Sequence, residues 1–128
     1  MSELSLTQFT KLIVAKLEAI STNVTLQNPT DISTFPCTVL RTPMEKVVKT
    51  ENGTPIKKVF SFSVEEWAQK QYDCMTMSNN SAIKLREYNI VKNSNDNIMY
   101  DDITKKYRLI SNYEVNYNGI TDSFELIK

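Results

Sequence analysis

The chain has 128 residues, of which 41% are hydrophobic and 23% are charged. This length predicts one domain over 1–128, and this composition is too apolar for a disordered protein. Fifteen acidic residues balance fifteen lysines and arginines, and the lack of a basic surplus argues against a protein dedicated to binding nucleic acid.

The first predicted element is an amphipathic helix that begins after Ser5. Ser5 and Gln8 have the spacing of a capping box, in which each side chain accepts a hydrogen bond from the backbone N–H of the other residue. An apolar stripe follows at intervals of three and four residues and comprises Leu6, Phe9, Ile13, Leu17 and Ile20. We expect this stripe to pack on a sheet, because the polar face lacks the basic surplus of a membrane-surface helix.

Two extended segments are predicted next, over 24–27 and 37–41. Turn-forming residues around Pro29 separate them, since the residue before a proline avoids the helical region. Thr42-Pro43 are expected to end the second strand.

A long hairpin is then predicted, with arms over 45–50 and from residue 56 onward. Asn52-Gly53 between them is the preferred pair for a type I′ turn, in which both central residues need a positive φ. Along the second arm the apolar residues alternate with polar ones, and they are Phe60, Phe62 and Val64. This alternation indicates a sheet with one buried face. It breaks at 66–68, where we expect a bulge or a bend from strand to helix.

A second helix is predicted over 69–86, from the spacing of Tyr72, Met75, Ala82 and Leu85. The run 78–81 (Ser-Asn-Asn-Ser) disfavours a helix interior. This segment therefore either kinks or divides into two short helices, with Ser81 capping the second.

The rest of the chain is predicted to contain a polar loop and two strands. The loop covers 93–97, and a long strand follows over 107–117. Asn118-Gly119 supply a turn, and a last strand returns over 120–127. One face of the long strand is expected to carry Tyr107, Leu109, Ser111, Tyr113, Val115 and Tyr117.

The residue types needed for several kinds of chemistry are missing or scattered. The chain has no histidine and only two glycines, so it lacks the usual neutral-pH base and any glycine-rich phosphate loop. Glu65 and Glu66 are adjacent on a strand and should point to opposite faces. Asp101 and Asp102 lack the further acids of a calcium loop. We therefore predict no catalytic, cofactor-binding or metal-binding residues, and no enzyme.

The two cysteines, Cys37 and Cys74, are too few for a disulfide framework. We expect both to be buried free thiols in a protein of a reducing compartment.

The order of these elements and the residues in three segments resemble a known family. Phe35-Pro36 precede the first central strand, and the stretch 60–68 (Phe-Ser-Phe-Ser-Val-Glu-Glu-Trp-Ala) follows the long hairpin. The C-terminal part runs from Tyr107-Arg108 through 113–119 to Phe124. In these features most of the chain resembles the tail terminator and tail-completion proteins of tailed bacteriophages and the related head–tail joining ring proteins. The segment around Asn79 and the last strand depart from that pattern, which leaves the joining role open.

This resemblance implies an α+β fold, in which an antiparallel β-sheet with a long β-hairpin is packed on one face by two α-helices. It implies a structural protein of the virion tail or neck, assembled in the bacterial host cytoplasm. The expected partners are further copies of the chain, in a ring of six or twelve, together with the portal or connector and the tail tube or a tail-hub protein. DNA would pass through the ring without sequence-specific recognition, and no membrane is involved.

Two groups of residues are candidates for the contacts between subunits. The lysines of the hairpin form either a solvated arm or an arm that reaches a neighbouring subunit, and aromatic residues are enriched at interfaces. The candidates are Lys46, Lys49, Lys57, Lys58, Trp67, Tyr107, Tyr113 and Tyr117.

Three functions of different classes stay open at this point. The first is the ring-forming virion protein. The second is a small monomeric binding module in the cytoplasm, such as a phage-encoded inhibitor of a host protein. The third is a subunit of an enzyme whose partner holds the catalytic groups.

Overall fold

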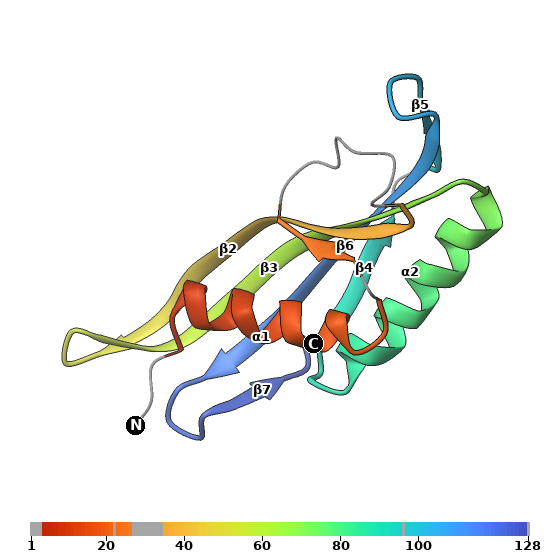
Figure 1. Ribbon diagram of the computed structural model, residues 1–128. Coiled ribbons are helices and arrows are strands. Elements are labelled where there is room, and N and C mark those ends of the chain that lie inside the picture. Colours follow the sequence, from red (N-terminus) through yellow and green to blue (C-terminus); the bar gives the residue numbers. More distant parts are fainter. Residues whose placement is uncertain (1–3, 22, 27–34, 96, 128) are drawn as a thin grey trace.

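The computed structural model describes residues 4–21, 23–26, 35–95 and 97–127. Two helices and seven strands lie within these ranges (Figure 1). They are α1 (Leu6–Glu18), β1 (Val24–Thr25), β2 (Cys37–Glu51), β3 (Thr54–Ala68), α2 (Gln71–Arg86), β4 (Val91–Asn95), β5 (Met99–Asp101), β6 (Lys106–Asn118) and β7 (Ser123–Glu125). The turn predicted around Pro29 lies outside the described residues.

The strands form one twisted sheet with the order β1-β2-β3-β6-β4, and β5 and β7 also pair with β6. All of these pairings are antiparallel except that of β1, which runs parallel to the start of β2. Both helices lie on the same face of the sheet (Figure 1). The predicted α+β class is therefore confirmed, and the short strand β1 makes the sheet mixed.

Helix α1 begins as the sequence predicts. The Ser5 hydroxyl accepts a hydrogen bond from the Gln8 N–H, and the Gln8 side chain accepts one from the Ser5 N–H, which completes the capping box. Phe9, Ile13 and Leu17 are fully buried against the sheet. Ile20 is exposed, because the helix has already ended at Glu18.

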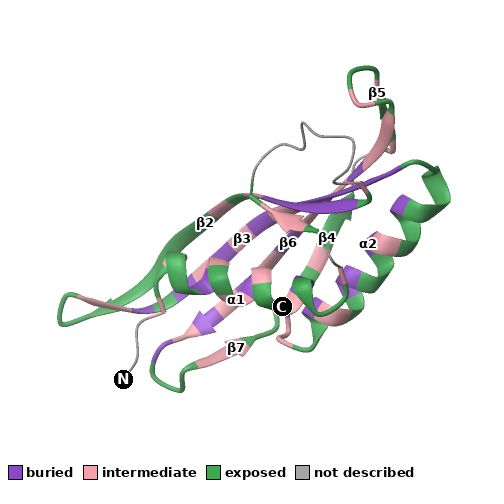
Figure 2. Ribbon diagram, viewed as in Figure 1, coloured by how far each residue is buried: buried purple, intermediate pink, exposed green. Residues whose placement is uncertain are grey.

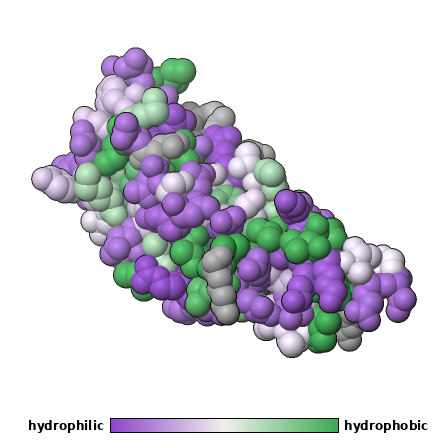
Figure 3. Space-filling model, turned by 180° about the vertical axis from the view of Figure 1, so that it is seen from behind, coloured by the Kyte–Doolittle hydropathy of each residue, from purple (hydrophilic) through white to green (hydrophobic). Residues whose placement is uncertain are grey.

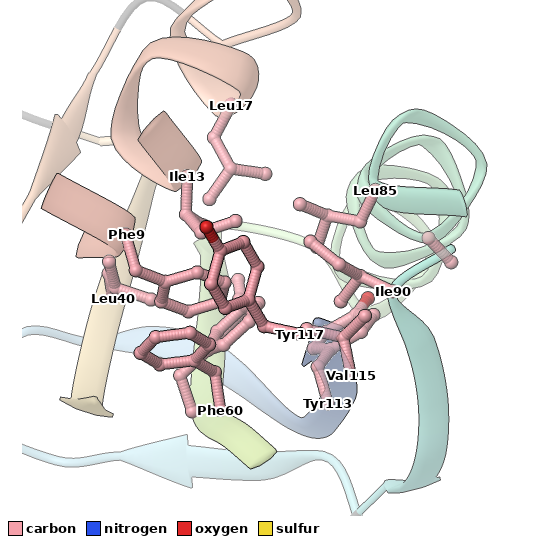
Figure 4. Close-up of a cluster of buried hydrophobic side chains, with 13 residues drawn as sticks. Phe9, Ile13, Leu17, Leu40, Phe60, Leu85, Ile90, Tyr113, Val115 and Tyr117 are labelled. Atoms are coloured by element: carbon pink, nitrogen blue, oxygen red, sulfur yellow. The ribbon is translucent and has the colours of Figure 1, made fainter. Parts of the chain in front are cut away.

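The main core lies between the two helices and the sheet (Figures 2 and 4). Side chains of β3 and β6 that point to the helices fill it, as the alternation predicts. Its fully enclosed members include Phe9, Ile13, Leu17, Phe60, Val64, Leu85, Ile90, Tyr113 and Val115.

Helix α2 is continuous from Gln71 to Arg86, so neither the predicted kink nor the division into two helices occurs. The reason lies in the two serines of its polar run. Ser78 Oγ lies 3.0 Å from Ser111 Oγ of β6, and Ser81 Oγ donates a hydrogen bond to Glu66 of β3. Hydroxyls that would otherwise compete for the helix backbone are thus engaged by the sheet.

The prediction that strand β2 ends at Thr42-Pro43 is wrong, because β2 continues to Glu51. Its register with β3 shifts between Arg41 and Met44, where Thr42 has a φ of 47°. This bulge accommodates a proline, which cannot donate to a ladder, because it interrupts the regular pairing at that point. The turn of the hairpin is as predicted, with a positive φ at both Asn52 and Gly53.

Of the two alternatives predicted for 66–68, the bulge does not occur in the pairing of β3 with β6, whereas the chain does pass from strand to helix there, since β3 ends at Ala68 and α2 begins at Gln71. The pairing keeps one register from Lys57 opposite Asn118 to Ala68 opposite Tyr107. The apolar alternation ends there because both faces of the strand are covered. Every residue from Val64 to Ala68 is buried.

The polar segment predicted as a loop over 93–97 instead begins inside a strand, because β4 extends to Asn95, and β5 follows from Met99. Both pair with β6, along the edge that β3 leaves free. The last strand is shorter than predicted, since β7 covers only Ser123–Glu125.

Candidate functional site

Four of the eight predicted interface residues are accessible. Lys46, Lys49 and Lys57 are exposed on the hairpin. Tyr107 is half-buried, and its ring lies edge-on to that of Tyr100, with the centroids 5.2 Å apart.

The other four, Lys58, Trp67, Tyr113 and Tyr117, belong to the interior of the protomer, and this corrects their prediction as surface anchors. Each is at most 4% exposed. The strand period explains three of them, because Lys58 lies directly opposite Tyr117 on the face that the helices cover, and Tyr113 shares that face. Lys58 Nζ donates to the Leu4 carbonyl oxygen at 3.0 Å and lies 3.1 Å from Glu45 Oε2.

Trp67 is buried on the opposite face of the sheet, in a small cluster with Phe35, Cys37 and Val39. Its Nε1–H donates to Glu65 Oε1 at 2.9 Å, and Arg41 Nε lies 2.8 Å from the other oxygen of that carboxylate. A hydrogen bond and an ion pair therefore stabilise Glu65 at this end of the sheet.

The outer edge of the hairpin is open. Strand β2 pairs with β3 along its length but with β1 only at Thr38 and Val39. Within the described ranges, no strand pairs with the outer edge from Met44 to Glu51. Three large apolar side chains on this stretch are exposed, namely Met44 (60%), Val47 (45%) and Val48 (59%). An unpaired edge of this length with apolar side chains is a template for another strand.

The surface seen from behind in Figure 3 mixes hydrophilic and hydrophobic side chains. This is the side of the sheet that the two helices leave uncovered. Among its residues, Ser63 Oγ donates to Asn112 Oδ1 at 2.6 Å, and the Asn112 amide donates to Ser94 Oγ at 3.0 Å. Hydrogen bonds between side chains thus stabilise the uncovered face in the centre of the sheet.

The hairpin also carries a pair of like charges. Lys49 and Lys57 are direct partners across the two strands, and like charges in such positions destabilise a sheet. Among the described residues, no acid forms an ion pair with either lysine.

A buried carboxylate lies at the other end of β2. Glu66 is 1% exposed and accepts hydrogen bonds from Thr38 Oγ1 and Ser81 Oγ, both at 2.7 Å. Burial raises the pKa of this carboxyl group above its usual range, and the two hydroxyls oppose that effect only in part. The Glu65 side chain instead accepts a hydrogen bond from Trp67 on the other face of the sheet, so Glu65 and Glu66 point to opposite faces, as predicted.

Glu66 lines a pocket of about 200 Å³ between the end of α1, the start of β2 and the middle of α2. Its other lining residues are Ile20, Ser21, Pro36, Thr38, Met77, Asn80 and Ser81. Sequence reasoning missed this site, although a signal was present: the alternation of Phe60, Phe62 and Val64 continues to Glu66 and places an acid on the buried face.

A serine and a lysine meet beneath α2. Lys92 Nζ donates to Ser78 Oγ at 2.7 Å, and burial lowers the pKa of this ammonium group. A lysine of lowered pKa beside a serine is one arrangement that activates a hydroxyl. Ser78 is only 2% exposed, however, and unlike Glu66 and Ser81 it does not line the pocket of about 200 Å³, so that pocket gives a substrate no access to the Ser78 hydroxyl.

The acids Asp101 and Asp102 do not form a cation site with other described residues. Asp101 accepts hydrogen bonds from both the backbone N–H and the hydroxyl of Thr104, so it caps the turn after β5. No group of three potential metal ligands occurs in the described part of the chain.

Neither described helix is long and apolar enough to cross a membrane. A scan against models of known protein families and a search of curated proteins both found no match.

Proposed function

We propose that this protein is a ring-forming structural subunit of a phage virion, which acts as a tail terminator, tail-completion or head–tail joining protein. The main support for this proposal is the open edge of the hairpin, along which Met44, Val47 and Val48 are exposed. Such an edge gains stability when it pairs with a neighbouring chain.

The shape of the protomer supports the same function. The hairpin extends beyond α1 at one end of the molecule, and α2 and β5 lie towards the other (Figure 1). A contact between two such different ends repeats from one copy to the next and closes into a ring when the rotation is suitable. The balance of fifteen basic and fifteen acidic residues limits mutual repulsion between many packed copies.

Light scattering coupled to size-exclusion chromatography, with negative-stain microscopy, tests this function. We expect closed rings or larger assemblies whose population rises with protein concentration. The variant Val48→Lys should weaken assembly about tenfold or more, because it places a charge in the apolar edge. Ile103→Lys is the matched control, since Ile103 is 90% exposed in the turn before β6, away from the hairpin.

A chain that stays monomeric at high concentration and binds neither isolated tail tubes nor connectors would contradict the proposal. That result would favour the monomeric binding module.

A further inference from the structure

We propose that a lysine from the hairpin of one copy, Lys49 or Lys57, inserts its ammonium group into the Glu66 pocket of the next copy. This inference rests on the self-association proposed above and identifies a specific contact within it. The occupant of the pocket is thus a second copy of this chain.

The chemistry of the pocket suits a lysine side chain. Ile20, Pro36 and Met77 contribute apolar walls, and Glu66, Thr38 and Ser81 contribute oxygens. A lysine buries its aliphatic stem along apolar surface and needs acceptors only around its ammonium group. A volume of about 200 Å³ leaves room for one such side chain.

The electrostatics of the pocket favour a further cation. Glu66 receives hydrogen bonds from two neutral hydroxyls, and none of the described lysines and arginines forms an ion pair with it, although the charge of Lys92 attracts the carboxylate without direct contact. A buried carboxylate with no directly bound cation is costly and is stabilised when one arrives. Each carboxylate oxygen has a second lone pair available for the incoming ammonium group.

Two exposed lysines of the hairpin repel each other. Lys49 and Lys57 face each other across the hairpin and are both exposed. If one of these two ammonium groups binds a carboxylate of another copy, the repulsion between the two lysines is relieved. Lys58, the adjacent lysine, cannot take this role because it is buried and bonded within its own protomer.

The contact cannot form within one protomer. Thr38, which lines the pocket, and Lys49 lie eleven positions apart on the same strand, β2, and this spacing corresponds to about 35 Å of extended chain. The pocket therefore lies beside the start of β2, whereas the hairpin turn lies at the other end of this strand (Figure 1). A contact between unlike surfaces on two copies is heterologous, which is the type that generates rings.

The test uses the charge-reversed variant Lys49→Glu/Lys57→Glu, the pocket variant Glu66→Gln, and a control of equal net charge, Lys11→Glu/Lys70→Glu. All four lysines are exposed, so these changes leave the core intact. Circular dichroism and urea unfolding first establish that each variant is folded. Sedimentation velocity should then show self-association weakened about 10- to 100-fold in the hairpin and pocket variants, and unchanged in the control.

A mixture of the two defective variants gives the sharpest result. The hairpin variant keeps an intact pocket, and Glu66→Gln keeps intact lysines, so together they can form one productive contact. We expect the mixture to form a one-to-one heterodimer, and we expect no assembly larger than this dimer.

The outcomes separate this inference from the proposed function. If the wild-type chain assembles and both variants assemble equally well, the lysine contact is wrong and the ring function stands. If only Glu66→Gln weakens assembly, another group occupies the pocket and the inference is also overturned. A wild-type chain that never assembles contradicts the ring function itself.

Discussion

The ring of Phe9 stacks on that of Phe60, with the centroids 4.2 Å apart and the planes inclined by 7°. Phe9 comes from α1 and Phe60 from β3, and both side chains are fully buried. This pair joins the first helix to a central strand of the sheet (Figure 4). Together with the buried Ile13 and Leu17, this contact attaches α1 to the sheet.

Phe9→Ala should lower the free energy of unfolding by about 3–5 kcal/mol, because it removes a buried ring and leaves a cavity. Urea unfolding followed by circular dichroism measures this change. Thr7→Ala, at an exposed position of the same helix, is the control and should change stability by no more than about 0.5 kcal/mol. A loss below about 1 kcal/mol for Phe9→Ala would show that the helix is attached mainly by other contacts.

Tyr113→Phe should leave stability unchanged or raise it by about 1 kcal/mol. The Tyr113 hydroxyl is buried and has no hydrogen-bond partner among the described residues, whereas its ring stacks on Phe62. Tyr117→Phe is the matched comparison, because the Tyr117 hydroxyl donates to the Asp122 carboxylate. That variant should lose roughly 1.5–3 kcal/mol. Equal effects in thermal or urea unfolding would contradict the assignment of these two hydroxyls.

Glu66→Gln should change how the stability of the monomer depends on pH. The folded chain raises the pKa of Glu66. The free energy of unfolding of the wild type therefore falls when this carboxyl ionises. This loss is absent below the ordinary carboxyl pKa of 4.5 and grows as the pH rises through the raised pKa of the folded state. Glutamine has no proton to lose, so the variant should gain stability over the wild type between pH 4 and pH 8.

Urea unfolding at several pH values, at concentrations where the chain is monomeric, measures this difference. Glu65→Gln is the control for the position next to it, since it breaks the ion pair with Arg41 and should destabilise the protein at pH 8. A difference between Glu66→Gln and the wild type that does not grow with pH would disprove the effect of burial on this carboxyl.

The two cysteines should be unreactive in the folded protein. Burial is the main cause that raises the pKa of Cys37 to about 12 and that of Cys74 to about 11. Because only the thiolate attacks, reaction with a disulfide reagent at pH 8 should be at least about a hundredfold slower than for an ordinary thiol. Absorbance after addition of the reagent should show no fast reaction in buffer and two equivalents in urea. Rapid labelling without denaturant would show that one of the sites opens.

The sequence carries the signals for the local features of this fold. Ser5 and Gln8 satisfy each other across three residues, and Asn52-Gly53 reverse the chain within a single turn. Each of these arrangements depends on neighbouring residues alone. The alternation along β3 and β6 is also local, because it requires only that one face of a strand be buried.

Tertiary contacts decide the features that the sequence alone did not predict. Helix α2 stays continuous because Ser78 and Ser81 bond to the sheet, and β4 forms because β6 offers a free edge. The same holds for the candidate interface, where Tyr113 and Tyr117 are buried by helices far from them in the sequence.

The sequence by itself therefore determined an α+β chain with a capped first helix, a tight hairpin and a one-sided alternation. Only the tertiary structure decided which lysines remain exposed, where the hairpin edge is left unpaired, and that Glu66 lines a pocket. The physical reason is that caps and turns are satisfied by residues a few positions apart. Burial and strand pairing depend instead on segments that meet only after the chain has folded.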